Sequence, residues 1–490
     1  MLRSLRDAAK LGGSLIGTWA VGLLVRIYMP RHLGPAAFGG FQFADAFTAT
    51  VFVAAGLGVE TYTRKEVATR HEHASDFFGG TFLLRLVLSA VVLAAGVAGL
   101  AAAGRSHQTL WLVAVLGVAQ VFANLNSTYA ALLQAVGRVD GLSAWNVGAK
   151  CLWGVGIALA LALGGGVMGV AVAMLGSEMV KAAALAVLSA RHVGLRFRVD
   201  MPATLAVVRA SLPFFIATLA QIVYCKVDVT IMAFLAGEME VGWYGAAGTL
   251  AGMSLLLSPL IGWVLLPLTS RAAARSEEEM MIVARRSMEV ILALAIPASL
   301  LLFVGAEPLV RLAFGRAYAP SAMSLRLLAP TFILTYAAMV SSSILVRLDR
   351  GWAVSWVSVS GVALSVVLNL WLVPHGLRAF GPGGGGVGAG TALVLTELYI
   401  AATTAWMIGR RGVDRRLARM VARTAAVCAA VIAADRLLAP WGDRRLAADA
   451  LLYTAGVLVT RAVNVRELAQ AARGVVRARF GAPPAAAAPV

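Results

Sequence analysis

The chain has 490 residues, of which 60% are hydrophobic and 13% are charged, and its formal net charge is +18. These proportions exclude a soluble globular protein, in which charged residues make up about a quarter of the chain. The positive charge does not indicate nucleic acid as a partner, because the basic residues follow the loops between apolar segments. Cys151, Cys225 and Cys428 lie far apart in predicted helices, so neither a disulfide framework nor a metal site is expected.

Apolar stretches long enough to cross a bilayer follow one another along the chain. We predict an all-α polytopic membrane protein with about fourteen transmembrane helices of some 20 residues each. The first stretch follows a basic N-terminus that resembles a signal peptide, but no polar domain succeeds it, so we expect an uncleaved span. The predicted spans are 11–30, 38–59, 78–103, 109–135, 142–163, 167–190, 210–236, 242–268, 287–306, 325–347, 352–373, 385–409, 417–438 and 446–463.

The loops between these spans alternate in positive charge. Arginines gather in every second connection, such as 191–209 and 410–423, and are sparse in the others, such as 307–324. Because cytoplasmic loops carry the excess of Lys and Arg, both termini are predicted to be cytoplasmic. Twelve spans and a hairpin on the membrane surface would satisfy the same pattern. We expect a multi-pass protein of the bacterial inner, or cytoplasmic, membrane.

Two parts of the sequence repeat one order of features. GPAAFGGFQFADAF (34–47), a hydrophobic run and ETYTRKEVATR (60–70) are echoed by EVGWYGAAGTL (240–250), a run and PLTSRAAARS (267–276). Repeated lobes around a central cavity are a common plan of transporters. The predicted parts are an N-lobe with six helices (1–200), a C-lobe with six (201–410), two additional helices (411–466) and a cytoplasmic tail (467–490), disordered at its end.

Four segments together resemble a known family. GPAAFGGFQFADAF, SLPFFIATLAQIVYCKVDVTIM, VGWYGAAG and LNLWLVPHGL with GVGAGTALVLTELY are similar to the Wzx-type polysaccharide flippases, and the likeness covers residues 10–410. That family belongs to the multidrug/oligosaccharidyl-lipid/polysaccharide (MOP) superfamily, with the lipid II flippases and the MATE drug exporters. The resemblance implies a MATE-like fold that carries a polyprenyl-diphosphate-linked oligosaccharide, such as an O-antigen unit of lipopolysaccharide, outward by alternating access. It implies membrane lipids, a polysaccharide polymerase and chain-length proteins as partners.

Cations inside predicted spans are the candidates for binding an anionic headgroup. Arg26, Lys150 and Lys226 would contact the diphosphate, since Arg offers a planar fork of donors and Lys a compact charge. Arg26 lies near the end of its span and could instead extend to the membrane surface. Asn146 is four residues before Lys150 and shares its helix face, and Tyr224 could face the sugar.

Charged residues in the first two spans and the third are assigned to gating or structure. Asp45 lies at a depth similar to that of Arg26 and could be its partner. Glu60 and Arg64 follow the second span and are expected to form a gating ion pair. Arg85 lies close to the start of its span, where extension toward the surface is the expected role.

Other charged residues are assigned to gating or ion coupling in later spans. Glu178 and Lys181 are three residues apart and could neutralise each other as a structural pair. Asp228 could orient Lys226 or bridge the lobes, and Glu397 is a candidate for proton or cation coupling.

No cofactor is expected. The chain contains no G-x-x-x-x-G-K-[ST] phosphate loop, and GPGGGGVGAG (381–390) lacks its Lys and hydroxyl ending. We interpret this run as a flexible turn that leads into the twelfth span. An H⁺ or Na⁺ gradient or the membrane potential would then supply the energy.

Several functions remain open beside the flippase. A MATE-like drug or cation antiporter would need an anionic cavity, which the buried lysines disfavour, and a lipid II flippase would act on a related cargo. A membrane-embedded polysaccharide polymerase or ligase would be a different class. Such enzymes usually carry a long external loop with catalytic Arg or His, and the longest external segment here is 307–324. We therefore expect no enzymatic activity.

Overall fold

A computed structural model describes residues 2–60, 62–63, 66, 74–193, 199–258, 261, 265–409, 412 and 414–462. Across these ranges the secondary structure is helical and includes no strand. Eleven helices in this part of the chain are long and apolar enough to cross a membrane. The predicted all-α polytopic class is confirmed.

The chain divides into two compact units. The first contains Met1–Thr249, Val310–Ser324 and Val359–Ala392, and the second contains Leu250–Leu309, Leu325–Ser358 and Leu393–Val490. Three long helices therefore contribute one end to each unit. These units are defined by packing and do not coincide with the lobes predicted from the sequence at 1–200 and 201–410. The two lobes stay a prediction.

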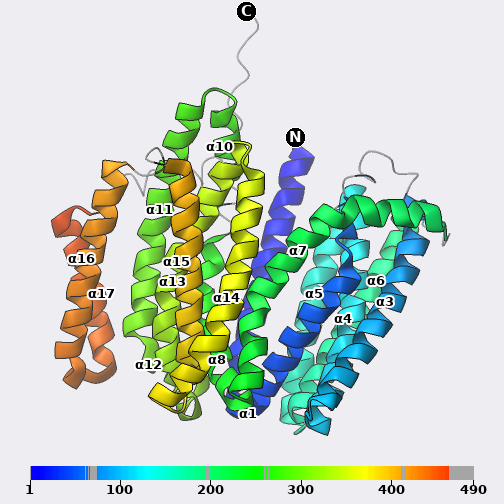
Figure 1. Ribbon diagram of the computed structural model, residues 1–490, viewed down its shortest axis with the longest axis horizontal. Helices are drawn as coiled ribbons and strands as arrows, with labels where there is room; N and C mark the ends of the chain where they lie inside the picture. The colour runs from blue at the N-terminus through cyan, green and yellow to red at the C-terminus, as the bar shows by residue number, and fades with distance from the viewer. Residues whose placement is uncertain are drawn as a thin grey trace, which may run out of the picture. The chain divides into compact units, whose positions relative to one another are not determined.

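The first unit is built on a bundle whose helices lie side by side (Figure 1). Its longest helix, α1, changes direction at Gly34, where φ is +75° and the backbone is not helical. Glycine adopts this conformation without the steric cost that a Cβ would bring. The two predicted spans 11–30 and 38–59 are the two arms of α1. The helices of this unit are α1 (Leu2–Gly56), α3 (Ala74–Ala102), α4 (His107–Ala135), α5 (Val139–Ala162), α6 (Gly166–Val193), α7 (Met201–Leu235) and α8 (Glu238–Ala251).

Helix α7 combines a short apolar segment, Met201–Leu212, with a span, Thr218–Leu235, and Figure 1 shows it bent. Asp200 caps its start by accepting a hydrogen bond from the Ala203 amide at 3.1 Å. The short segment packs closely on α3, because a Cβ added to Gly80 would lie 1.8 Å from the Thr204 hydroxyl oxygen.

Two predicted spans differ from the observed helices. The span expected at 242–268 is broken: α8 ends at Ala251, a 3-10 turn covers Gly252–Leu257, and a short helix, α10 (Leu266–Ala273), follows. The last span is α17 (Arg445–Thr460), which has only 16 residues. These two segments and the second arm of α1 account for the difference between fourteen predicted spans and eleven long helices.

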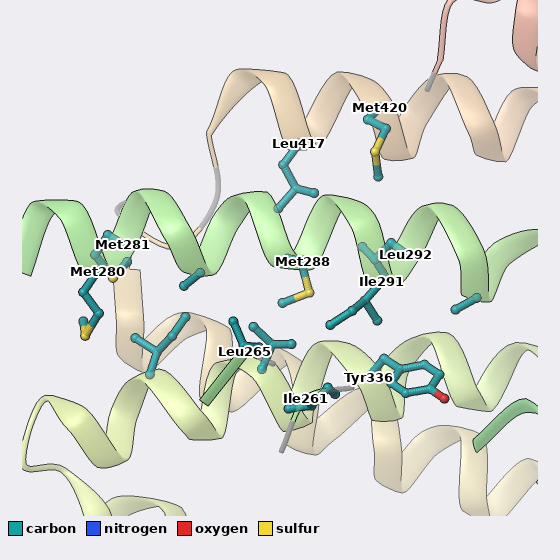
Figure 2. Packing of buried hydrophobic residues seen from close by; sticks show 14 of the residues in the cluster. Ile261, Leu265, Met280, Met281, Met288, Ile291, Leu292, Tyr336, Leu417 and Met420 are labelled. Carbon is teal, nitrogen blue, oxygen red and sulfur yellow. The ribbon is translucent and has the colours of Figure 1, made fainter. Parts of the chain in front are cut away.

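The second unit has its own apolar core. Figure 2 shows Leu417 and Met420 of α16 pointing toward α11, where Met288 and Leu292 lie. Tyr336 is buried in the same core and donates a hydrogen bond to the Ser254 carbonyl at 2.5 Å. The remaining helices are α11 (Glu277–Val304), α12 (Ala306–Phe314), α13 (Ser321–Arg347), α14 (Gly351–Phe380), α15 (Gly384–Ile408) and α16 (Arg415–Leu437), and α12–α15 also contribute to the first unit.

The close contact between α3 and α7 predicts a stability difference between two glycines of α3. Gly80→Ala should lower the free energy of unfolding by about 1–3 kcal/mol, because the new methyl group overlaps Thr204. Gly99→Ala is the matched control, since a Cβ there meets nothing within 4 Å and alanine favours a helix. Thermal unfolding in detergent measures both; equal midpoints for the two variants would contradict the contact.

Candidate functional site

Charges predicted inside the spans gather in the first unit. Arg26 lies on the first arm of α1, Asp45 on its second arm, Lys150 on α5 and Lys226 on α7. Counted at 1.5 Å per residue from the ends of the predicted spans that we expect to be external, Arg26 lies about 6 Å along its span, and Asp45, Lys150 and Lys226 lie roughly 10–20 Å along theirs. Helix α1 contacts both α5 and α7, so the four side chains belong to neighbouring helices.

An ion pair joins α1 to α7. The Lys226 ammonium lies 2.8 Å from Asp45 Oδ2, and the side chains are 33% and 26% exposed. Asp45 was predicted to pair with Arg26, and this is wrong, because the second arm of α1 packs against α7 and presents Asp45 to Lys226. Arg26 is exposed and forms no ion pair within the described ranges.

Lys150 is held by an aromatic ring. Its ammonium lies 3.6 Å from the centre of the Trp153 ring, one turn further along α5, in an arrangement that attracts a cation to the ring face. Its Cε lies 3.6 Å from the position that a Cβ would take on Gly22 of α1. The charges that act on it come from Arg26, Glu178, Lys181 and Asp45. The predicted cations therefore share one electrostatic environment.

Two carboxylates, Glu178 on α6 and Asp228 on α7, have neutral partners. Asn126 of α4 donates to Glu178 Oε2 at 2.7 Å. The predicted structural pair between Glu178 and Lys181 is wrong, since neither residue has an ion pair in the described chain. The Tyr244 hydroxyl of α8 donates to Asp228 Oδ2 at 2.7 Å. Lys226 and Asp228 thus connect α7 to two different helices.

The structure does not test the roles predicted for the remaining candidate residues. Asn146, one turn before Lys150, and Tyr224, just before Lys226, are half-buried. Glu397 is 5% exposed and belongs to the part of α15 in the second unit. Arg64 lies outside the described residues. The roles assigned to these residues stay predictions.

A second polar cluster lies at the opposite end of the first unit's helices. Arg85 of α3 is 2% exposed and lies 3.0 Å from Glu60 Oε1, which also accepts a hydrogen bond from the Ser127 hydroxyl at 2.6 Å. Arg85 further donates to the Gly56 carbonyl and the Thr128 hydroxyl. The prediction that Arg85 extends to the surface is wrong, because these acceptors replace water around the guanidinium.

The repeated motifs of the sequence pack on each other. A Cβ on Gly39 would lie 1.7 Å from the Glu238 carbonyl oxygen, and one on Gly242 would lie 1.9 Å from the Pro35 carbonyl oxygen. Only glycine permits backbones to approach so closely. The segments 34–47 and 240–250 therefore join the second arm of α1 to α8.

The glycine run at 381–390 begins as a turn that leads into α15, as predicted. The expectation that this run is flexible is wrong, because most of it is packed closely against α14. A Cβ on Gly384 would lie 2.2 Å from the Gly376 carbonyl oxygen, and one on Gly388 would lie 2.2 Å from the Leu372 carbonyl oxygen. Residues 383–390 are buried. Here α14 and α15 touch through their backbones.

Sequence reasoning missed Glu240, which is buried and 5% exposed. Its carboxylate accepts hydrogen bonds from the amides of Gly383 at 2.6 Å, Gly385 at 3.0 Å and Gly386 at 3.4 Å. Burial raises the pKa of Glu240, and the three amides oppose that shift. Two features of the sequence could have indicated this contact. One is the acidic residue that opens the motif 240–250, and the other is the glycine-rich start of a helix near 383, where a negative charge is stabilised.

The sequence comparison decides the family. Residues 4–273 match the family described as polysaccharide biosynthesis protein, which is more than half of the chain. The chain belongs to this family. No curated protein matches it.

Solved structures of the MOP superfamily share its fold. The lipid II flippase MurJ in an inward closed conformation is 11% identical, with a TM-score of 0.72 over 94% of this chain and 99% of that one. An inward-facing multidrug resistance MATE family transporter is 18% identical, with a TM-score of 0.65 over 80% and 94%. A mutant of the Vibrio cholerae MATE transporter VcmN is 15% identical, with a TM-score of 0.53 over 82% and 98%.

These findings confirm the MATE-like fold and the predicted resemblance to the MOP superfamily. This member of the polysaccharide biosynthesis family is a multi-pass membrane protein, and the solved structures that share its fold include a lipid II flippase and a multidrug resistance transporter.

Glu240 should be more important for stability than an exposed carboxylate. Glu240→Ala should lower the free energy of unfolding by about 3 kcal/mol, since it leaves three buried amides without an acceptor. Glu279→Ala is the control, because Glu279 is half exposed and pairs only with Arg275 at 3.6 Å, a contact worth less than about 1 kcal/mol. Chemical unfolding in detergent measures both, and equal losses would contradict the capping role.

The Arg85 cluster should show the signature of a buried ion pair. Arg85→Met alone should lower the free energy of unfolding by about 3–5 kcal/mol, because Glu60 loses its charged partner inside the protein. The double variant Arg85→Met/Glu60→Leu should lose less, since no uncompensated charge remains. A double-mutant cycle with additive losses would show that the two residues act independently.

Proposed function

We propose that this protein is a flippase that moves a polyprenyl-diphosphate-linked oligosaccharide from the cytoplasmic to the external leaflet by alternating access. The observation that supports this most is the cluster of Arg26, Lys150 and Lys226 inside a transporter fold of the polysaccharide biosynthesis family. The proposal places the protein in the bacterial inner membrane, with both termini in the cytoplasm.

The sign of the charge in the first unit supports an anionic cargo. The cluster and the charged residues around it comprise four cations and three carboxylates. The cations are Arg26, Lys150, Lys181 and Lys226, and the carboxylates are those of Asp45, Glu178 and Asp228. Its formal charge is therefore positive. Arg and Lys are the side chains that bind phosphate oxygens most strongly, so a diphosphate fits this cluster. A drug or cation antiporter would need the opposite sign.

The second unit has an apolar cavity of its own. This cavity of about 440 Å³ lies among α11, α13, α15 and α16 and is lined mainly by apolar side chains such as Met288, Val340 and Leu417, together with Arg285. Burying a flexible, wholly apolar chain on such side chains is favourable.

The proposal includes an energy source and partners. Transport would be coupled to an H⁺ or Na⁺ gradient or to the membrane potential, which supplies about 2.3 kcal/mol per charge per 100 mV. A polysaccharide polymerase and chain-length proteins would act on the exported unit as O-antigen or a related surface polysaccharide.

Depletion of the protein tests the function. Lipid-linked oligosaccharide should accumulate on the cytoplasmic leaflet, measured by extraction of polyprenyl-linked glycans and labelling with an impermeant probe, while surface polysaccharide is lost. Complete units already outside would favour a polymerase or ligase. Arrested peptidoglycan synthesis with accumulation of lipid II would favour a lipid II flippase.

Variants in the same assay test the cations. Arg26→Ala and Lys226→Ala should each abolish export at normal expression, because each removes a charge expected to bind the diphosphate. Arg326→Ala is the control, since Arg326 forms an exposed pair with Glu307 at 2.8 Å outside the cluster. Normal export by both cluster variants would contradict the site.

A further inference from the structure

The Asp45–Lys226 ion pair joins segments that we predict to belong to different lobes. Asp45 lies in residues 1–200 and Lys226 in residues 201–410, and both side chains are partly exposed. The protein therefore leaves part of each side chain uncovered. Close to it, the repeated motifs join α1 to α8 through Gly39 and Gly242.

The cations of the cluster differ in whether a carboxylate of the protein already binds them. Arg26 has no ion pair in the part of the chain that the structure describes, and Lys150 rests on the Trp153 ring. Lys226 already has an anion, the Asp45 carboxylate, at 2.8 Å. A carboxylate and a phosphate oxygen are alternative partners for one ammonium.

We propose that Asp45 is an internal competitor of the substrate: the phosphate group of the lipid-linked cargo displaces Asp45 from Lys226 and thereby removes the ion pair between α7 and α1. The anion first meets Arg26 and Lys150, which hold no carboxylate that must be removed. It then exchanges with Asp45 on Lys226. This inference rests on the proposed function, and it assigns to one ion pair the step that links binding to helix movement.

The exchange has a thermodynamic consequence. A ligand shifts a conformational equilibrium only by the difference between its affinities for the two states. If the intact pair competes with the substrate, the substrate binds the state in which the Asp45–Lys226 pair is open more tightly than the state in which it is intact. Removal of Asp45 should therefore raise substrate affinity and uncouple binding from movement.

The test uses the full-length protein in lipid nanodiscs, with undecaprenyl diphosphate as the probe. Asp45→Asn keeps the shape of the side chain and should raise the affinity about fivefold, as expected for loss of a partly exposed ion pair, while slowing export in cells. A gain in affinity distinguishes competition from a purely structural role, which would leave affinity unchanged or lower it.

Glu178→Gln is the matched control. It removes the same formal charge from the same cluster, but Glu178 is bound to Asn126 and not to Lys226, so its effect on affinity should be less than twofold. An equal gain in affinity for the two variants would show that any lost negative charge in the cluster has the same effect. That result would overturn the proposed exchange.

Two further results separate the inference from the proposed function. Unchanged or weaker binding by Asp45→Asn, with normal binding by the unaltered protein, overturns the exchange and leaves the flippase proposal standing. Failure of the unaltered protein to bind undecaprenyl diphosphate contradicts the diphosphate site, and the exchange fails with it.

Discussion

A charge inside a membrane-spanning helix is costly unless groups of the protein replace water around it, and this constraint organises the first compact unit. Lys226 meets Asp45, Lys150 meets a tryptophan ring, and Arg85 meets Glu60 and backbone carbonyls. Each contact joins side chains on helices that are neighbours in space, except the one between Lys150 and Trp153, which are a turn apart. The packing of these helices therefore supplies a polar or aromatic partner for each of the three cations.

Close backbone contacts provide the second constraint. The glycines of the repeated motifs bring the second arm of α1 against α8, and those at 383–390 bring α15 against α14. Without a strong hydrophobic force between helices in lipid, such small residues allow the van der Waals contacts that hold helices together. Glu240 adds an ionic cap at the second junction. Close backbone junctions and partly exposed ion pairs thus occur in the same unit.

The proposed function rests on the combination of fold and charge. The MATE-like fold is shared by proteins whose cargoes differ, so it does not identify the cargo. The positive cluster favours an anion, and the family favours a step in polysaccharide biosynthesis. The diphosphate-linked oligosaccharide that we propose as cargo satisfies both conditions, and in our proposal its binding acts on the Asp45–Lys226 pair that joins α1 to α7.

The sequence by itself determined the membrane class, the approximate positions of the spans and the identities of the charges inside them. These properties are local, because hydropathy and length decide whether a segment can cross a bilayer. It also contained the motifs that indicated the superfamily. The break after α8 was not evident from the sequence. The apolar residues continue beyond Ala251, although the backbone there does not continue as one helix.

Only the tertiary structure decided the partners. Spacing along one helix suggested that Glu178 pairs with Lys181, but its partner is Asn126 on another helix. Similar depth suggested that Asp45 pairs with Arg26, but its partner is Lys226 on α7. Likewise Glu240 and the glycines near 383 are about 145 residues apart and meet only because α8 and α15 start side by side. The choice of partner depends on the rotation and packing of neighbouring helices, which no local pattern encodes.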